Sequence, residues 1–202
     1  MNSKVLTTLE YDKILLRLGR HAATSLGKEL IGQLSPSCDF EEVKRRLKGT
    51  DEAVQVERLK GAPPFGGIVD IRPALQRARI GGMLQASELL DVADTVSGGR
   101  RLKRFLLDAH DDSPIAQIAA LAEQISESRE VEERIRSCID DSAEVVDSAS
   151  AELSRIRHEL RTGEARIRER LEQMIRTPSV QKMLQDNLIT IRYNRYVFPV
   201  KQ

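Results

Sequence analysis

The chain has 202 residues, and its 32 basic side chains against 31 acidic ones give a formal net charge of +1. Attraction to nucleic acid by a global basic field is therefore excluded, and any such contact needs a local patch. Hydrophobic residues make up 40% and aromatic residues 3%, with no tryptophan, so we expect a core of Leu, Ile, Val and Ala. Cys38 and Cys138 lie far apart, and no signal core or membrane-spanning apolar run is present. We expect a cytoplasmic protein without membrane contact.

Apolar residues recur at helical spacing from the N-terminus to residue 139, and loops rich in Pro and Gly separate the helices. Asp39, with Glu42 three residues later, predicts a capping box at the start of the third helix. Gly98 and Gly99 fall inside a long predicted helix and indicate a kink. The helices predicted in this region span residues 5–19, 25–33, 40–60, 73–80, 87–107, 115–124 and 130–139.

A long charged helix follows over residues 151–176, with Ser148 or Ser150 as its N-cap. At 1.5 Å per residue it would span about 35–40 Å, longer than a compact helical core needs. Its apolar residues have near-heptad spacing, so they form a seam that requires a partner helix. The seam consists of Leu153, Ile156, Leu160, Ile167, Leu171 and Met174.

The basic residues of this helix are all arginine, which suits bidentate phosphate contacts. Glutamates cancel most of their charge, and the i,i+4 pairs Glu164–Arg168 and Glu172–Arg176 favour a solvated helix face instead.

Residues 188–201 follow a short helical turn at 180–184 and are typical of two strands joined by a turn. An isolated two-stranded hairpin is marginal in water, so we expect the front part of a larger protein, cut where a small β unit begins. The candidate nucleic-acid-binding residues lie here: Arg192, Arg195, Lys201 and Tyr193. Aromatic residues among basic ones suit base stacking and phosphate pairing. For the aromatic residues, packing across a sheet is the better interpretation, whereas for Arg192 and Arg195 the two interpretations are about even.

Catalytic and metal-binding patterns are absent from the sequence. The three histidines are scattered, with no neighbouring Cys or His at ligand spacing. Ser25-Leu-Gly-Lys28 has the Gly-Lys of a phosphate-binding loop without the rest of that motif. We expect no catalytic residue, metal site or cofactor in this chain.

Several segments, in this order and spacing, resemble the N-terminal region of the second bacterial MutS family, the endonuclease and ribosome-rescue paralogue of the mismatch-repair protein MutS. They are Leu9-Glu-Tyr-Asp-Lys-Ile14, Ser25-Leu-Gly-Lys-Glu29, Gly66-Gly-Ile-Val-Asp-Ile-Arg-Pro73, Asp147-Ser-Ala-Ser150 and Ile191-Arg-Tyr-Asn-Arg-Tyr-Val-Phe-Pro-Val-Lys201. A departure occurs at Tyr193-Asn-Arg195, where an Asn-Gly type of turn would be expected.

The resemblance implies a mainly α fold in three parts. Residues 1–147 would form a helical core domain, 148–185 the outgoing lever helix and its turn, and 186–202 the first strands of a truncated clamp. The parent protein would be a homodimeric, MutS-like ATPase and endonuclease, with ATP and Mg bound in an ATPase domain and cleavage in a Smr nuclease domain, both absent here. The complete clamp would bind branched DNA, suppressing homologous recombination, and would bind and split stalled or collided ribosomes.

An alternative from another class is a free-standing helical interaction module that dimerises through its long helix. The apolar seam supports this alternative, whereas Gly163 and the four-residue step from Ile167 to Leu171 weaken a strict heptad.

Overall fold

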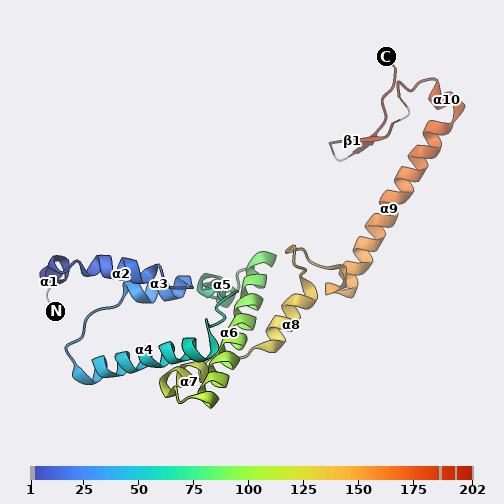
Figure 1. Cartoon of the computed structure of the whole chain (residues 1–202). Helices are drawn as coiled ribbons and strands as arrows, with labels where there is room; N and C mark the ends of the chain where they lie inside the picture. The colour runs from blue at the N-terminus through green and yellow to red at the C-terminus, as the bar shows by residue number, and fades with distance from the viewer. Residues whose placement is uncertain (1–2, 187, 194, 202) are drawn as a thin grey trace. The chain divides into compact units, whose positions relative to one another are not determined.

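A computed structural model describes residues 3–186, 188–193 and 195–201 (Figure 1). The described residues are mainly α-helical and include a two-stranded antiparallel hairpin near the C-terminus, which confirms the predicted fold class. The chain divides into two compact units, Met1–Val145 and Val146–Gln202. Within the described ranges, every helix is too short or too polar to cross a membrane.

The helices of the first unit begin and end close to the predicted bounds, with one exception. The single helix predicted at the N-terminus is wrong: Glu10 has a φ of 51°, in the left-handed region that a right-handed helix cannot contain, so two helices form. The helices are α1 (Ser3–Thr8), α2 (Tyr11–Gly19), α3 (Ser25–Gly32), α4 (Phe40–Lys60), α5 (Arg72–Arg79), α6 (Ala86–Asp112), α7 (Ala116–Glu123) and α8 (Arg129–Cys138).

The core of the first unit lies where α4, α6 and α7 meet. Val56, Ala109 and Ile115 are almost fully buried there, and Phe105 and Ile118 pack against them from the edge. Small aliphatic residues dominate, as the low aromatic content predicts. This packing fixes the direction of α6, the longest helix of the unit.

A buried carboxylate ties α4 to α7. Glu52 is 3% exposed, and its Oε2 accepts hydrogen bonds from the backbone N–H groups of Gln117 at 2.8 Å and Ile118 at 3.0 Å. The first N–H groups of a helix have no partner within the helix, so Glu52 supplies the acceptor that the start of α7 lacks. No hydrogen-bond partner for its second oxygen, Oε1, occurs among the described residues.

The glycine pair of α6 marks close packing rather than a kink. The helix is continuous from Ala86 to Asp112, so the expected kink at Gly98 and Gly99 is not observed. A Cβ on Gly98 would lie 2.8 Å from Ile68 Cγ1 and 3.1 Å from Gly66 O. The loop after α4 therefore rests directly on the backbone of α6.

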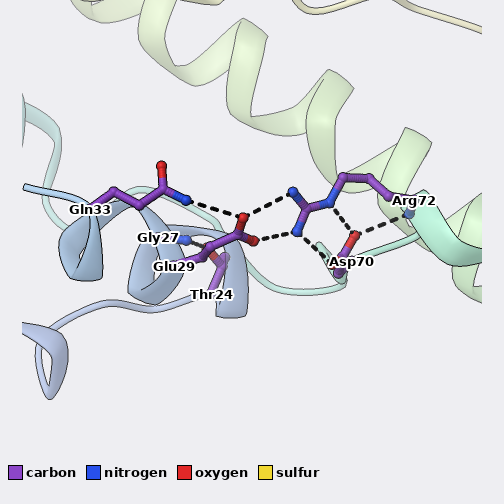
Figure 2. A network of polar contacts seen from close by, with 6 residues as sticks. All are labelled: Thr24, Gly27, Glu29, Gln33, Asp70 and Arg72. Carbon is purple, nitrogen blue, oxygen red and sulfur yellow. Dashed lines mark hydrogen bonds and ion pairs between the residues drawn. The ribbon is translucent and has the colours of Figure 1, made fainter.

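An ion-pair network joins α3 to the loop before α5 (Figure 2). Arg72 Nε and Nη2 donate to Asp70 at 2.8 and 2.7 Å, and its Nη1 donates to Glu29 Oε1 at 3.3 Å. The hydrogen bonds from the Arg72 side chain, and then that from the Arg72 backbone N–H, lower the pKa of Asp70 to about 2. No residue of α1–α3 whose burial the structure describes is buried, so this network supplies a specific contact between the segment and the rest of its unit.

The predicted capping box at α4 forms only in part. Asp39 accepts from the Glu42 N–H at 3.0 Å, as expected of an N-cap. The Glu42 side chain does not return to the Asp39 backbone, because it accepts a hydrogen bond from Ser37 Oγ and pairs with Arg46. The Asp39 N–H donates to Ser37 Oγ instead.

The second unit contains a long helix, a short helix and the hairpin, preceded by a single 3-10 turn. Of the two predicted N-caps, Ser150 takes the role, because its Oγ accepts from the Leu153 N–H at 3.1 Å. The elements are η1 (Asp147–Ala149), α9 (Ala151–Arg176), α10 (Pro178–Gln181), β1 (Thr190–Arg192) and β2 (Arg195–Val197).

Candidate nucleic-acid interface

The N-terminal end of α9 is fixed to the turn that precedes it. Asp147 accepts from Arg157 Nη1 at 2.7 Å and from Arg161 Nη2 at 2.8 Å, two positions one helical turn apart on α9. The hydrogen bond from Arg157 and then that from Arg161 lower the pKa of Asp147. The beginning of the long helix is thus held by a carboxylate outside the helix.

Further ion pairs run along α9, with partners that differ from those predicted. Arg155 pairs with Glu152 and Glu159, each at 2.6 Å. Arg168 pairs with Glu172 at 3.3 Å, and neither of the predicted pairs, Glu164–Arg168 and Glu172–Arg176, forms within the described residues. The helix surface is therefore solvated and mixed in charge, as its composition predicts.

The predicted seam of α9 is mostly exposed. Ile156 is 41% exposed, Leu160 61%, Ile167 51% and Met174 44%, whereas Leu153 and Leu171 are half-buried. The buried position is Ile175, which the sequence analysis missed. The sequence pattern that could have predicted this burial is the four-residue spacing of Ile167, Leu171 and Ile175. These three residues lie on one face of the helix, whereas the predicted heptad continued to Met174.

The hairpin is anchored at its open end by a bridge between Leu184 and Val200. The Gln185 N–H donates to Pro199 O at 3.0 Å, and the Lys201 N–H donates to Met183 O at 2.8 Å. Leu184 is 4% exposed and is a second buried residue that the sequence analysis missed. These bonds connect the segment after α10 to the segment that follows β2.

The strands pair in a register that leaves a two-residue loop. Thr190 pairs with Val197, Ile191 with Tyr196 and Arg192 with Arg195. Tyr193, in the loop, has a φ of 50°, which a two-residue loop of the primed type requires and which usually favours Gly or Asn. Asn194, the other position of this loop, where the sequence departs from the expected Asn-Gly type of turn, lies outside the described residues.

The last pair before the loop places two cations directly opposite each other. Arg192 and Arg195 are both exposed, and neither forms an ion pair with a carboxylate among the described residues. Like charges in opposed strand positions are destabilising. An anion bound between the two guanidinium groups would remove this repulsion, so the pair has the chemistry of a phosphate contact.

The hairpin lies on one side of the C-terminal half of α9 (Figure 1). Residues of both elements line two cavities. One, of about 580 Å³, includes Arg168, Arg176 and Gln181 in its lining, and the other, of about 500 Å³, includes Ile167 and Arg195. Both cavities share the cross-strand pair Ile191 and Tyr196. Tyr196 therefore lies on the side of the hairpin that faces α9, opposite Ile191 in the strand pair.

Three of the four candidate binding residues come together at the hairpin tip. Arg192 and Arg195 flank the loop, and the Tyr193 side chain between them is fully exposed. Lys201 lies at the open end of the hairpin instead, where its Nζ donates to Lys182 O at 3.4 Å. The structure thus gives Lys201 a place apart from the other three.

A metal centre has no basis in the described part of the chain. No group of three or more His, Cys, Asp or Glu side chains there is arranged to hold an ion. Cys38 and Cys138 are both free thiols.

Comparison with known proteins gives relatives over the whole chain. No protein-family model matches it. The chain is 50% identical over 203 residues to a Geobacillus protein named endonuclease MutS2, 50% identical over 202 residues to that of Brevibacillus brevis, and 48% identical over 203 residues to that of Bacillus cereus. Each match covers 100% of this chain and 26% of the relative, so the chain spans about a quarter of the length of the curated relatives it matches.

Proposed function

Because this chain belongs to the second bacterial MutS family, that of endonuclease MutS2, we propose that it is the non-catalytic core, lever and partial clamp of such a protein. The parent protein binds branched DNA, by which it suppresses homologous recombination, and binds and splits stalled or collided ribosomes. ATP hydrolysis with Mg and strand cleavage take place in other regions of the homodimeric parent, and this chain supplies no catalytic group.

The opposed pair Arg192 and Arg195 is the observation that carries this proposal. Two exposed guanidinium groups, which pair with no carboxylate among the described residues, flank the loop that carries the fully exposed ring of Tyr193. Arginine pairs contact consecutive or opposed phosphates, and an exposed aromatic ring stacks on an unpaired base. DNA branch points and ribosomal RNA both offer these features.

Helix α9 suits the role of a lever. Its 26 residues span about 39 Å at 1.5 Å per residue. Asp147 fixes its first turns through Arg157 and Arg161, while the hairpin lies beside its C-terminal half. A displacement at the Asp147 end is thereby transmitted along a continuous helix to the arginine pair.

Binding of a fluorescently labelled four-way DNA junction, measured by anisotropy, tests the proposal. The chain and the full-length protein that contains it are each compared with their Arg192→Gln and Arg195→Gln double variants. We expect the double variant to bind at least tenfold more weakly in the full-length protein, and ribosome binding in pelleting assays to fall as well.

The matched control replaces two exposed arginines of the first unit that have no ion pair within the described residues, Arg79→Gln and Arg134→Gln. This pair changes the net charge equally and is expected to leave junction and ribosome binding within twofold. Equal binding by wild type and the hairpin variant would remove the hairpin tip from the interface.

Exposure of the seam favours a second candidate, dimerisation through α9. Leu160 and Ile167 are 61% and 51% exposed within their unit. Light scattering coupled to size exclusion discriminates between the two candidate functions. A monomer at every accessible concentration would reject the hypothesis of an interaction module that dimerises through α9. If a dimer is found, Leu160→Asp with Ile167→Asp should abolish it, and a persisting dimer would be held by another surface.

A further inference from the structure

A depression formed only by residues of the first unit has a preformed wall. It has a volume of about 540 Å³ and is bounded by the loop after α4, by α6 and by α8. Arg101 fixes the loop, since its Nη2 donates to Gly66 O at 2.9 Å and its Nη1 donates to Ser97 Oγ at 3.0 Å. The absence of a side chain at Gly98 lets the same loop rest on α6. The wall is therefore held in place without a ligand.

Four arginines line this depression, and they differ in how they are paired. Arg101 is bound to the loop, and Arg100 Nη1 pairs with the buried Glu132 at 2.9 Å. Arg104 and Arg129 are exposed, and neither forms an ion pair or a side-chain hydrogen bond with another described residue. Two guanidinium groups on different helices are thus available to a ligand in one depression.

The acidic residues of the depression do not neutralise these two groups. Asp108 follows Arg104, and Glu133 follows Arg129, by one helical turn, the spacing at which ion pairs form on a helix. Neither carboxylate lies within ion-pair distance of its neighbouring arginine. The four arginines and two carboxylates of the lining give a formal excess of +2, which favours an anion.

The lining also offers an apolar surface beside the cations. Phe105, one residue after Arg104, and Pro64 of the fixed loop are half-buried and line the same depression. An aromatic ring and a proline ring together accept the flat face of a nucleobase, while guanidinium groups accept phosphate oxygens in a bidentate manner. The combination distinguishes this depression from an evenly charged helix surface.

We propose that this depression binds a nucleoside phosphate, with its phosphate oxygens between Arg104 and Arg129 and its base against Phe105 and Pro64. The ligand is a free nucleotide or a terminal nucleotide of a nucleic-acid strand, since both present the same chemistry. The proposal uses only residues of the first unit and does not depend on the function proposed for the hairpin.

Isothermal titration of the chain with three probes tests this site: ATP, inorganic tripolyphosphate and a 5′-phosphorylated single-stranded octanucleotide. We expect saturable binding of ATP or the octanucleotide, with tripolyphosphate weaker because it lacks a base. Preference for ATP identifies a free nucleotide, and preference for the octanucleotide identifies a strand end. No saturable binding of any probe at millimolar concentration would overturn the proposal.

Paired variants locate the binding. Arg104→Gln with Arg129→Gln should weaken binding of the preferred probe at least tenfold, whereas Arg79→Gln with Arg134→Gln, which removes the same charge elsewhere in the unit, should change it less than twofold. An equal loss of probe affinity in both double variants would show that the probe is attracted by the overall charge of the unit, and it would contradict binding in this depression.

Chemical shift changes in the wild-type chain give an independent test if the variant does not fold. Saturation with the preferred probe should move the aromatic resonances of Phe105 and the Nε–H resonances of Arg104 and Arg129. Unmoved Phe105 resonances at saturation would reject this depression as the binding site. Junction binding by the hairpin is expected to survive in the depression variant, so the two proposals can fail separately.

Discussion

Arg192 and Arg195 are directly opposed in the last strand pair before the hairpin loop, with no carboxylate partner among the described residues. Such a pair weakens the unliganded hairpin, and it prepares two cations for an anion. In the proposed interface, the cost in local stability would be combined with a gain in anion binding.

Replacing one member by a carboxylate should stabilise the free hairpin. Arg195→Glu places opposite charges across the strands, which contributes roughly 0.2–1 kcal/mol, and it removes the repulsion as well. We expect slower amide hydrogen exchange at Thr190 and Val197, a hydrogen-bonded pair of the ladder, at low salt, with the difference shrinking at high salt. Arg195→Lys, which keeps the charge, is the control and should leave exchange almost unchanged. Faster exchange in the glutamate variant would contradict the repulsion.

Glu52 should be a large single contributor to the stability of the first unit. Glu52→Ala leaves the N–H groups of Gln117 and Ile118 buried without their acceptor, which we expect to cost about 2–4 kcal/mol. Glu52→Gln retains an amide oxygen for both donors and should cost less than half as much. Urea denaturation followed by circular dichroism measures both. Equal losses would mean that the carboxylate charge, and not the acceptor, stabilises α7.

Gly98 and Gly99 should respond in opposite ways to alanine. A Cβ at Gly98 would lie 2.8 Å from Ile68 Cγ1, so Gly98→Ala must displace the loop and should cost about 1–3 kcal/mol. A Cβ at Gly99 would lie 3.4 Å from Ile125 Cγ2, an ordinary contact, and Gly99→Ala should be neutral or stabilise the helix by up to about 1 kcal/mol. Urea denaturation of both variants tests this, and a Gly98→Ala protein as stable as wild type would exclude the close packing.

The Asp70–Arg72–Glu29 network should respond to acid. The pKa of Asp70 is lowered from 3.8 to about 2 in the folded chain, chiefly by the Arg72 side chain and then by the Arg72 N–H. Because the pKa of Asp70 is lower in the folded chain than in the unfolded chain, its ionised carboxylate stabilises the folded state fully when the pH is above the unfolded pKa. This contribution to the stability of the fold is lost as the pH falls from about 4 towards 2.

Carboxyl carbon titration by NMR checks the network residue by residue. Arg72→Gln should raise the pKa of Asp70 towards its ordinary value while the backbone donor remains, and should raise the pKa of Glu29 as well. Arg79→Gln, on the same helix, should move neither. An Asp70 pKa that stays near 2 in the Arg72 variant would assign the shift to the backbone alone.

The sequence predicted the helices well because their apolar periodicity and Pro/Gly boundaries are local features. The continuity of α6 was not predictable, because Gly98 makes room for a loop that lies about thirty residues earlier in the chain. The break at Glu10 depends on a single backbone conformation that no sequence pattern announced. Glu52 was missed for a related reason: its partners are 65 and 66 residues away along the chain.

Strand-like sequence interrupted by a turn predicted the hairpin, and basic residues among aromatic ones suggested the candidate interface, but the strand register decides which residues meet. The pairing of Arg192 with Arg195 follows from a two-residue loop that a Tyr-Asn sequence does not signal strongly. Lys201 looked equivalent in sequence, and the bridge between Leu184 and Val200 places it at the other end of the hairpin. The depression between α6 and α8 joins residues from three separate segments, so periodicity alone does not reveal it.

The salt dependence of junction binding tests the central claim most directly. Each phosphate contact contributes about 0.9 to the slope of log K against log salt concentration, so loss of two contacts should reduce the slope by about 1.8. We predict this reduction for Arg192→Gln with Arg195→Gln in the full-length protein, and an unchanged slope for Arg79→Gln with Arg134→Gln. An identical slope for wild type and the hairpin variant would show that the opposed arginines do not contact the phosphate backbone.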